Sequence, residues 1–232
     1  MLLLASNQRI LVNLASLWTR FTGSWIRALH LLYPNLSLPS LLLAIPSKLV
    51  TVLRVFGRIL VDTLHVRQCT IDDLETLMEL GEITFRQTFA KDNTLEDMDS
   101  YVRQNFSAET LGRELSDNNS SFFLVQYQDL PVAYMKLNRG NAQTESNHKG
   151  ALELQRIYVL NEYKHRHIGK LLLDTAIRIA QDEGATYLWL GVWEHNTKAI
   201  AFYLKQGFVV SGTHHFILGS DTQTDHIMKL SI

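Results

Sequence analysis

The sequence predicts an α/β domain over residues 62–232, with a mixed central sheet flanked by helices. Two observations carry this prediction. Apolar residues recur at helical spacing in some segments and alternate with polar residues in others, and the two kinds of segment interleave along the chain. Residues 1–61 contain no Asp or Glu, so all 23 acidic residues of the chain lie at or after Asp62. This abrupt change in composition marks a domain boundary.

The composition is that of a globular protein. The chain has 232 residues, of which 46% are hydrophobic, which is enough for one domain with a sizeable core and an extension. Its single cysteine, Cys69, excludes an internal disulfide and fits a reducing compartment, so we expect a cytoplasmic protein. The nine histidines are scattered, and no Cys/His spacing resembles a zinc site, so we expect no metal.

The basic, acid-free extension over residues 1–61 allows three interpretations. Residues 48–61 place basic residues on one helical stripe and apolar residues on another, as in a helix that lies on an anionic membrane surface. The segment could instead be a targeting peptide, or upstream sequence included by an early start codon. None of its apolar runs reaches the ~18 residues of a spanning helix.

The first half of the domain should contain one strand, three helices and a hairpin. Thr70, Thr94 and Ser107 are typical helix N-caps, and Thr70 and Thr94 each have a carboxylate three residues on. Apolar residues follow at helical spacing, and the second and third helices should end near Phe106 and Ser116. We expect strands at 64–67, 121–127 and 132–137, the last two forming a hairpin, and a loop over 139–150.

The strand over residues 151–160 changes face partway along. Leu152 and Leu154 occupy even positions, whereas from Ile157 the apolar positions are odd. Because side chains alternate strictly along a strand, this shift requires one inserted residue, a β-bulge. The alternative is a strand that is buried on both faces beyond Arg156.

The second half alternates helices and strands. Residues 169–183 form an amphipathic helix that Gly184 ends, and Asn196 opens a second helix that Gly207 closes. Strands are expected at 186–192 and near 207–216 and 224–230. The order along the domain is therefore β-α-α-α-β-β-β-α-β-α-β-β, which indicates a mixed sheet.

The helix that begins at Asn196 carries the first candidate site. Asn196 and Tyr203 lie seven residues apart, so they share a helix face with Ala199 and Ile200 between them. An amide and a phenol on an otherwise apolar face, at the mouth of a sheet, indicate a binding site. A simple N-cap and a half-buried tyrosine would give the same pattern.

A basic segment at the start of the preceding helix is the second candidate. Residues 162–170 read Glu-Tyr-Lys-His-Arg-His-Ile-Gly-Lys. Backbone amides at a helix N-terminus attract phosphate, and Lys164, Arg166 and Lys170 add positive charge. The alternative is a solvated basic helix start.

These motifs, taken in order, resemble the GNAT superfamily of acetyl-CoA-dependent N-acetyltransferases over roughly residues 64–232. The family's C-terminal motif matches Asn196 and then Ala199-x-x-Phe-Tyr203-x-x-x-Gly207-Phe208. Three further segments resemble more particularly the bacterial PaiA-type spermidine/spermine acetyltransferases. They are Trp189-Leu-Gly-Val-Trp193-Glu, Gly212-Thr-His-His-Phe216-Ile-Leu-Gly219 and Gln223-Thr-Asp225-His-Ile-Met228.

The resemblance implies a GNAT fold, with a bulged and splayed fourth strand, and acetyl-CoA as co-substrate. The family's pyrophosphate motif, Gln/Arg-x-x-Gly-x-Gly/Ala, matches Lys164, His167 and Gly169, so two of its three positions differ here. If His167 needs a positive φ, the strain costs on the order of 1 kcal/mol and would weaken CoA binding. The implied cofactor-binding residues are Ile157, Tyr158 and Val159, which would pair with the pantetheine arm, and Lys164, His165, Arg166, His167, Ile168, Gly169, Lys170, Asn196 and Tyr203.

The resemblance also implies catalytic roles. Tyr203 would protonate the departing CoA thiolate, since a phenol with a pKa of ~10 can donate to a thiolate of similar basicity. Glu153 would take the proton of the acceptor amine, directly or through water; the alternative is an ordinary exposed strand carboxylate. A backbone N–H of the bulged strand would meet the developing oxyanion.

An acidic surface that flanks the first two helices would wall the acceptor site and concentrate a polycation, unless it is only a solvated helix face with acids at a helix start. Three further side chains could shape the pocket or simply pack. The acidic residues are Glu82, Asp92, Glu96, Asp97 and Asp99, and the further side chains are Trp189, Trp193 and His214.

We therefore expect an acetyl-CoA-dependent N-acetyltransferase that acts on the primary amine of a small molecule, with a polyamine such as spermidine/spermine as the leading acceptor. Direct attack is expected, because Cys69 precedes the first helix, away from the motifs. The alternatives are a protein or peptide N-terminal acetyltransferase, a non-catalytic CoA-binding regulator, and a membrane-associated protein addressed by residues 1–61. We expect no nucleic-acid partner and membrane contact only through residues 1–61, and a homodimer stays open.

Overall fold

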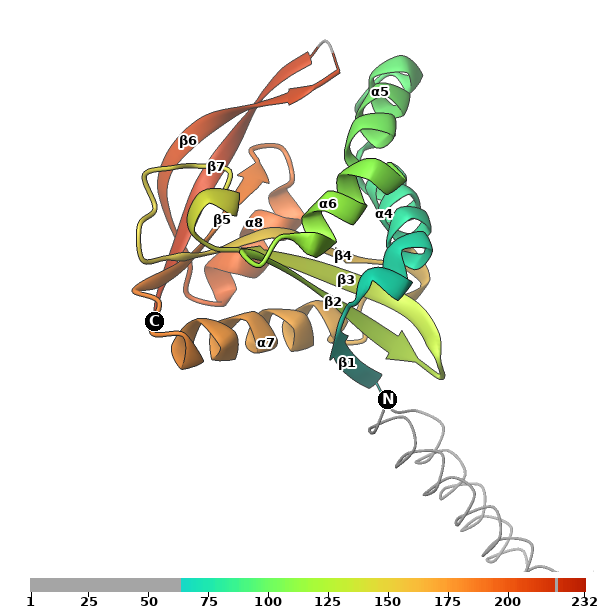
Figure 1. Cartoon of the computed structure of the whole chain (residues 1–232). Coiled ribbons are helices and arrows are strands. Elements are labelled where there is room, and N and C mark those ends of the chain that lie inside the picture. Colours follow the sequence, from blue (N-terminus) through green and yellow to red (C-terminus); the bar gives the residue numbers. More distant parts are fainter. Residues whose placement is uncertain (1–63, 220) are drawn as a thin grey trace, which may run out of the picture. The chain divides into compact units, whose positions relative to one another are not determined.

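A computed structural model describes residues 64–219 and 221–232, which form one mixed sheet with helices on both faces (Figure 1). The sheet has seven strands in the order β1-β2-β3-β4-β5-β7-β6. Only β4 and β5 are parallel, so the predicted mixed α/β fold is confirmed. The strands are β1 (Leu64–Gln68), β2 (Ser120–Tyr127), β3 (Leu130–Asn138), β4 (Leu152–Val159), β5 (Tyr187–Trp193), β6 (Val209–Leu218) and β7 (Asp221–Ser231).

The side-chain caps that the sequence predicted are present at the starts of η1, α5, α6 and α8. Thr70 and Asp73 form a reciprocal capping box ahead of η1 and α4. The hydroxyls of Thr94 and Ser107 each accept a backbone N–H three residues on. The helices are η1 (Ile71–Asp73), α4 (Leu74–Phe89), α5 (Leu95–Asn105), α6 (Ala108–Ser116), η2 (Gly140–Ala142), η3 (Asn161–Tyr163), α7 (Ile168–Asp182) and α8 (Thr197–Lys205).

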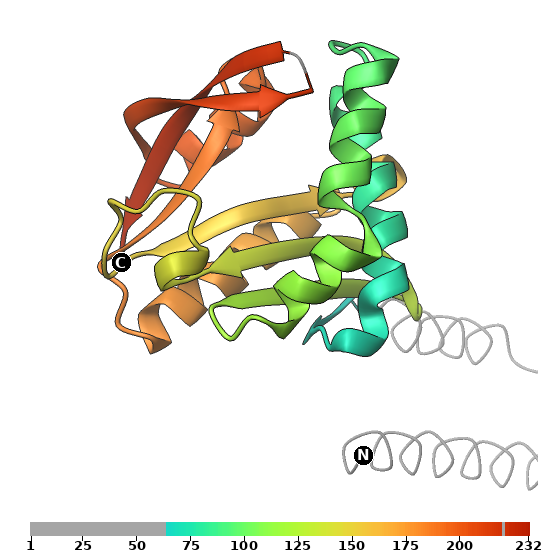
Figure 2. The same cartoon turned by 45° about the horizontal axis from the view of Figure 1, so that its top comes forward.

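The sheet separates two apolar cores. On one face the strands pack against α7 and α8, through side chains such as Leu172 and Tyr203. On the other face they pack against α4, α5 and α6, with Leu77, Phe85 and Met98 fully buried. Figure 2 shows α7 on the opposite side of the sheet from α4–α6. Each large apolar side chain buried in these layers stabilises the fold by about 1.5–3 kcal/mol.

Strand β4 contains the predicted bulge. Its neighbour β3 pairs Lys136 with Arg156, and the next residue of β3 pairs with Leu154, so Gln155 is the inserted residue. The alternative, a strand buried on both faces beyond Arg156, is wrong, because residues 157–159 are only half-buried.

Just before the bulge, β4 also leaves its parallel neighbour. The ladder between β4 and β5 contains only Leu152 and Glu153, paired with Leu188 and Trp189. The two strands therefore diverge after Glu153, and the splayed sheet opens at their carboxyl ends.

The interpretations of residues 1–61, including the amphipathic helix over 48–61, concern residues outside those that the structure describes. Within the described ranges, no helix has both the length and the hydropathy needed to cross a membrane.

Candidate active site

The opening between β4 and β5 lies where two helices begin. β4 leads through η3 into α7, and β5 leads directly into α8. The carboxyl ends of parallel strands followed by helix N-termini commonly hold anionic ligands, because the first helical N–H groups have no intrahelical partner. The β6–β7 hairpin rises on one side of this opening and α4 and α5 on the other (Figures 1 and 2).

The second half of β4 has one backbone edge that β5 does not cover. Ile157, Tyr158 and Val159 pair with β3 on their other side, whereas the ladder with β5 has already ended at Glu153. Peptide groups on such an edge can pair with an extended, amide-containing chain as an added strand would. A linear ligand with amide groups fits this edge.

The turn before α7 is strained at two histidines. His165 and His167 have φ of 65° and 61°, in the left-handed region that disfavours residues with a Cβ. His167 is the N-cap residue of α7, and its side chain makes no capping hydrogen bond. The predicted positive φ at His167 is therefore present in the structure, and His165 shares it.

Gly169, one residue inside α7, leaves open space. A Cβ added there would meet nothing within 4 Å in the described part of the chain, and Gly169 does not have a positive φ. Neither the backbone conformation nor packing requires glycine at this position. A ligand that approaches the helix N-terminus closely would require it.

The basic side chains around this turn differ in their interactions with neighbouring residues. Lys170 forms an ion pair with Asp174, and the guanidinium of Arg166 lies 5.2 Å from the ring centre of Tyr163. Burial and the neighbouring charge of Lys198, the second residue of α8, lower the pKa of Lys164. Two ammonium groups that repel each other between the starts of α7 and α8 favour an anion there.

The face of α8 has the predicted arrangement. The side-chain oxygen of Asn196 accepts the N–H of Ala199 at 3.2 Å, so Asn196 caps the helix. Tyr203 is 6% exposed, and burial raises the pKa of its phenol. Asn196, Ala199 and Tyr203 all line one pocket, whereas Ile200 does not.

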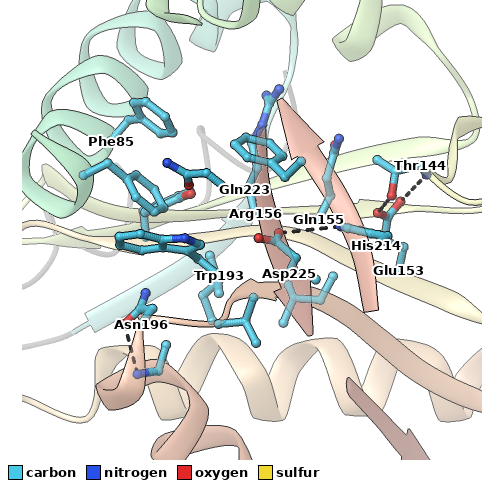
Figure 3. Close-up of a pocket in the computed structure, with 18 of the residues that line it drawn as sticks. Phe85, Thr144, Glu153, Gln155, Arg156, Trp193, Asn196, His214, Gln223 and Asp225 are labelled. Atoms are coloured by element: carbon cyan, nitrogen blue, oxygen red, sulfur yellow. Dashed lines mark hydrogen bonds and ion pairs between the residues drawn. The ribbon is translucent and has the colours of Figure 1, made fainter. Parts of the chain in front are cut away.

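That pocket has a volume of about 280 Å³ and lies beside the free edge of β4 (Figure 3). Its walls come from both sides of the opening: Phe85, Phe89 and Tyr101 from α4 and α5, and the β6–β7 hairpin opposite. Of the predicted cofactor-binding residues on β4 and at the start of α7, Ile157 and Tyr158 line it, but Val159 and residues 164–170 do not. The pocket thus extends from Tyr203 to the opening between β4 and β5. The turn before α7 is a separate part of the site.

Glu153 lies in the wall of the pocket and is only 2% exposed, which contradicts the alternative of an exposed strand carboxylate. Its Oε2 accepts the side-chain N–H of Asn138 at 2.9 Å and the backbone N–H of Thr144 at 3.0 Å. Its Oε1 accepts the Thr144 hydroxyl, as Figure 3 shows. Burial raises the pKa of Glu153, and these donors oppose that shift.

Two more carboxylates face the same pocket around His214. The ring Nδ1 of His214 is 3.0 Å from Oε1 of Glu145, and its Nε2 is 3.6 Å from Oδ2 of Asp225. The neighbouring Asp225 is the main cause of the raised pKa of His214, with a further contribution from Glu145 against the effect of burial. Arg156 also lines the pocket, but its guanidinium pairs with Glu114 at 2.9 Å.

The structure corrects the predicted acidic wall. None of the five predicted acidic residues, which lie on α4 and α5 or between them, lines the pocket. Arg86 pairs with both Glu82 and Asp99, and Asp97 is buried in the cap of α5. The acidic side chains of the pocket come instead from β4, β7 and the loop over 139–150.

Of the three residues predicted to shape the pocket, two line it and one does not. Trp193 and His214 line the pocket, whereas Trp189 is fully buried and donates its indole N–H to Gln143 at 2.7 Å. Cys69 lies outside the pocket, and burial raises the pKa of its thiol to about 12, so it is not a ready nucleophile.

Sequence reasoning did not identify Glu145, Asp225 or Gln223 as pocket residues. Asp225 and Gln223 stand two residues apart within a quoted motif, which was a usable signal. Glu145 lies in an irregular loop and gave none.

Comparison with known proteins identifies the family. Residues 80–208 match the family model described as the acetyltransferase (GNAT) family. The chain is 34% identical over 165 residues to an uncharacterized N-acetyltransferase of Lactobacillus delbrueckii subsp. lactis, covering 71% of this chain and 95% of the relative. The chain belongs to the GNAT family and is an acetyl-CoA-dependent N-acetyltransferase.

Two further comparisons concern Thermoplasma acidophilum. The chain is 31% identical over 157 residues to a spermidine N(1)-acetyltransferase of that organism, covering 65% of this chain and 91% of the relative. The crystal structure of its PaiA N-acetyltransferase in complex with coenzyme A superposes with a TM-score of 0.62 at 29% identity, covering 73% of this chain and 99% of that one. The expected resemblance to the PaiA-type enzymes is confirmed.

The described residues fit acetyl-CoA as co-substrate. The open space at Gly169 and the Lys164–Lys198 pair suit a pyrophosphate, and the free edge of β4 suits an amide-containing arm. Tyr203 lies in the pocket beside this edge.

Proposed function

We propose that this enzyme transfers acetyl groups to a primary amine of a polyamine such as spermidine. The observation that carries this proposal is the charge of the pocket beside the free edge of β4. Glu145, Glu153 and Asp225 line it, and its one arginine, Arg156, is paired with Glu114 outside it. A substrate with several ammonium groups complements this surface. The Thermoplasma relative that is named a spermidine acetyltransferase supports the same acceptor.

Acetyl transfer to an amine requires three functions of the active site. Acetyl-CoA supplies an activated acetyl group as a thioester. The enzyme must remove a proton from the attacking ammonium, stabilise negative charge on the carbonyl oxygen while the C–N bond forms, and deliver a proton to sulfur as the C–S bond breaks. Direct attack suits this site, because Cys69 lies outside the pocket with a pKa of about 12.

Glu153 is the proposed proton acceptor. Its buried carboxylate has a raised pKa, which makes it a better base than an ordinary glutamate. Three donors already occupy it, so we expect a water molecule to carry the proton from the amine to Glu153. The backbone N–H groups of β4 beyond the bulge are the proposed donors to the carbonyl oxygen.

Tyr203 is the proposed proton donor to the thiolate. Its phenol lines the pocket from the helix that Asn196 caps. The phenol is protonated at neutral pH, which is the form that donates, and burial raises its pKa further.

The test follows free thiol from acetyl-CoA with spermidine, a monoamine of similar shape, and a peptide with a free N-terminus. We expect spermidine to have the highest kcat/KM, and its advantage over the monoamine should shrink as salt rises, since ~1 M salt shortens the screening length to ~3 Å. Equal salt responses for the two amines, or turnover of the peptide alone, would contradict the polyamine assignment.

A further inference from the structure

The ring of His214 packs closely against a glycine of the sheet. The residue beneath it on β5 is Gly191, where an added Cβ would lie 3.1 Å from both Cε1 and Nε2 of His214 and 3.3 Å from Oδ2 of Asp225. Gly191 has no positive φ, so its backbone does not require glycine. The glycine therefore leaves room for the imidazole and its carboxylate partner inside the pocket wall.

Both ring nitrogens of His214 face carboxylates. Nδ1 lies 3.0 Å from Glu145, and Nε2 lies 3.6 Å from Asp225. Only the imidazolium can donate from both nitrogens, because a neutral ring keeps one of them as an acceptor. The contact at 3.6 Å is too long for a hydrogen bond, so Asp225 is only loosely paired.

The pocket also holds acceptors that lack donors. Within the described residues, Oδ1 of Asp225 and Oε1 of Gln223 are buried without a hydrogen-bond partner. Gln223 is 7% exposed, and its amide nitrogen donates to Asn93 and to the Asp221 carboxylate, which fixes the orientation of the amide. Gln223 and Asp225 are two residues apart on β7, so they lie on one face about 7 Å apart. An elongated ligand rich in N–H donors would satisfy both.

We propose that His214 is an internal counter-ion, which a second ammonium group of the acceptor replaces between Glu145 and Asp225. This inference rests on the proposed polyamine function and makes His214 a specificity-determining residue. An ammonium group brings three donors and one positive charge. The imidazolium then releases one proton to solvent, so the net charge of the pocket stays constant. A monoamine has no second ammonium and cannot make this exchange.

The pH dependence follows from the groups around His214. Glu145 and His148 approach it from the loop over 139–150 and Asp225 from β7. Glu153 of β4 lines the same pocket, and Gly191 of β5 places no side chain against the ring. The next residue on the same strand, His215, also lines the pocket. Asp225 and Glu145 raise the pKa of His214 above its usual ~6.5. Below that raised pKa the imidazolium competes with the substrate, and above it the two carboxylates are free to bind ammonium.

The first test measures KM for spermidine and KM for a monoamine across pH 5.5–9. The first value is divided by the second, because both amines must lose a proton from the attacking nitrogen and the ratio removes this shared effect. In the wild-type chain the spermidine/monoamine KM ratio should fall by about tenfold as pH rises through the titration of His214, the size expected of one charge-assisted hydrogen bond. In His214→Gln the ratio should be low at all pH values. His65→Gln, on the exposed face of β1, is the matched control and should behave as wild type.

The second test needs no variant to fold. NMR titration of the His214 ring, without acetyl-CoA, should show a lower pKa when spermidine is bound than when the monoamine is bound, because linkage is reciprocal. An unchanged or raised pKa with bound spermidine, or a spermidine KM that rises in His214→Gln at every pH, overturns the counter-ion role. If spermidine is acetylated and the KM ratio is flat, only this inference fails. If spermidine is neither bound nor acetylated, the proposed function fails with it.

Discussion

Replacing His167 by glycine should stabilise the protein without weakening acetyl-CoA binding. His167 has φ 61° and ψ 12° at the start of α7. Its side chain is exposed and makes no hydrogen bond or ion pair with the described residues, so glycine removes strain and no contact. The left-handed conformation costs an L-residue roughly 1–2 kcal/mol, and glycine gives back about 0.4–1 kcal/mol through the larger entropy of the unfolded chain. The difference lies between roughly 0 and 1.6 kcal/mol, with a central value of about 0.8 kcal/mol.

Thermal unfolding of the full chain measures this gain. For a domain of 150–250 residues, 1 kcal/mol raises Tm by about 2–4 °C, so His167→Gly should raise Tm by roughly 1–4 °C. His167→Ala is the matched control, because it removes the same imidazole but keeps the Cβ, and it should give no such gain. Because the strain is already present without ligand, calorimetry should show acetyl-CoA affinity that is maintained or modestly tighter.

Two results would refute this reasoning. An equal Tm gain in His167→Ala would mean that the imidazole itself destabilises the turn and that φ is irrelevant. A loss of acetyl-CoA affinity in both variants, with Tm unchanged, would show that the His167 side chain contacts the cofactor.

Three further predictions concern the site and the domain. Tyr203→Phe should lower kcat by roughly 10²-fold, the range for loss of a general acid, while calorimetry shows CoA affinity nearly intact; an unchanged kcat would remove Tyr203 from the mechanism. Gly191→Ala should displace His214, whose ring atoms lie 3.1 Å from the new Cβ position, and so lower the spermidine/monoamine KM ratio at low pH as His214→Gln does; an unchanged ratio would argue against His214 as the competing counter-ion. Deleting residues 1–61 should leave acetyl transfer and Tm about the same, because the strands and helices of the described residues complete a sheet with two covered faces. Failure of the shortened chain to fold would place the domain boundary elsewhere.

The elements of the fold were predictable because their signals are local. The caps at Thr70, Thr94, Ser107 and Asn196 act on backbone groups within three residues, so the sequence alone locates the helix starts. The bulge of β4 was predictable as well, because the alternation of side chains along one strand shows the insertion. Its position at Gln155 needed the pairing with β3.

The candidate site was only partly predictable. Asn196 and Tyr203 share one helix, and the turn before α7 is continuous in sequence, so spacing alone relates their residues. The acidic wall was wrong, since charge along α4 and α5 does not reveal that Arg86 pairs with Glu82 and Asp99.

The sequence by itself determined the order of elements, the family and the residues that flank the opening of the sheet. Only the tertiary structure decided which carboxylates face the acceptor. Glu145, Glu153 and Asp225 come from a loop and from strands β4 and β7, which are not adjacent in the sheet and are far apart in the chain. Their meeting around His214 depends on strand pairing and on the space that Gly191 leaves, and both are long-range properties of packing that no local pattern encodes.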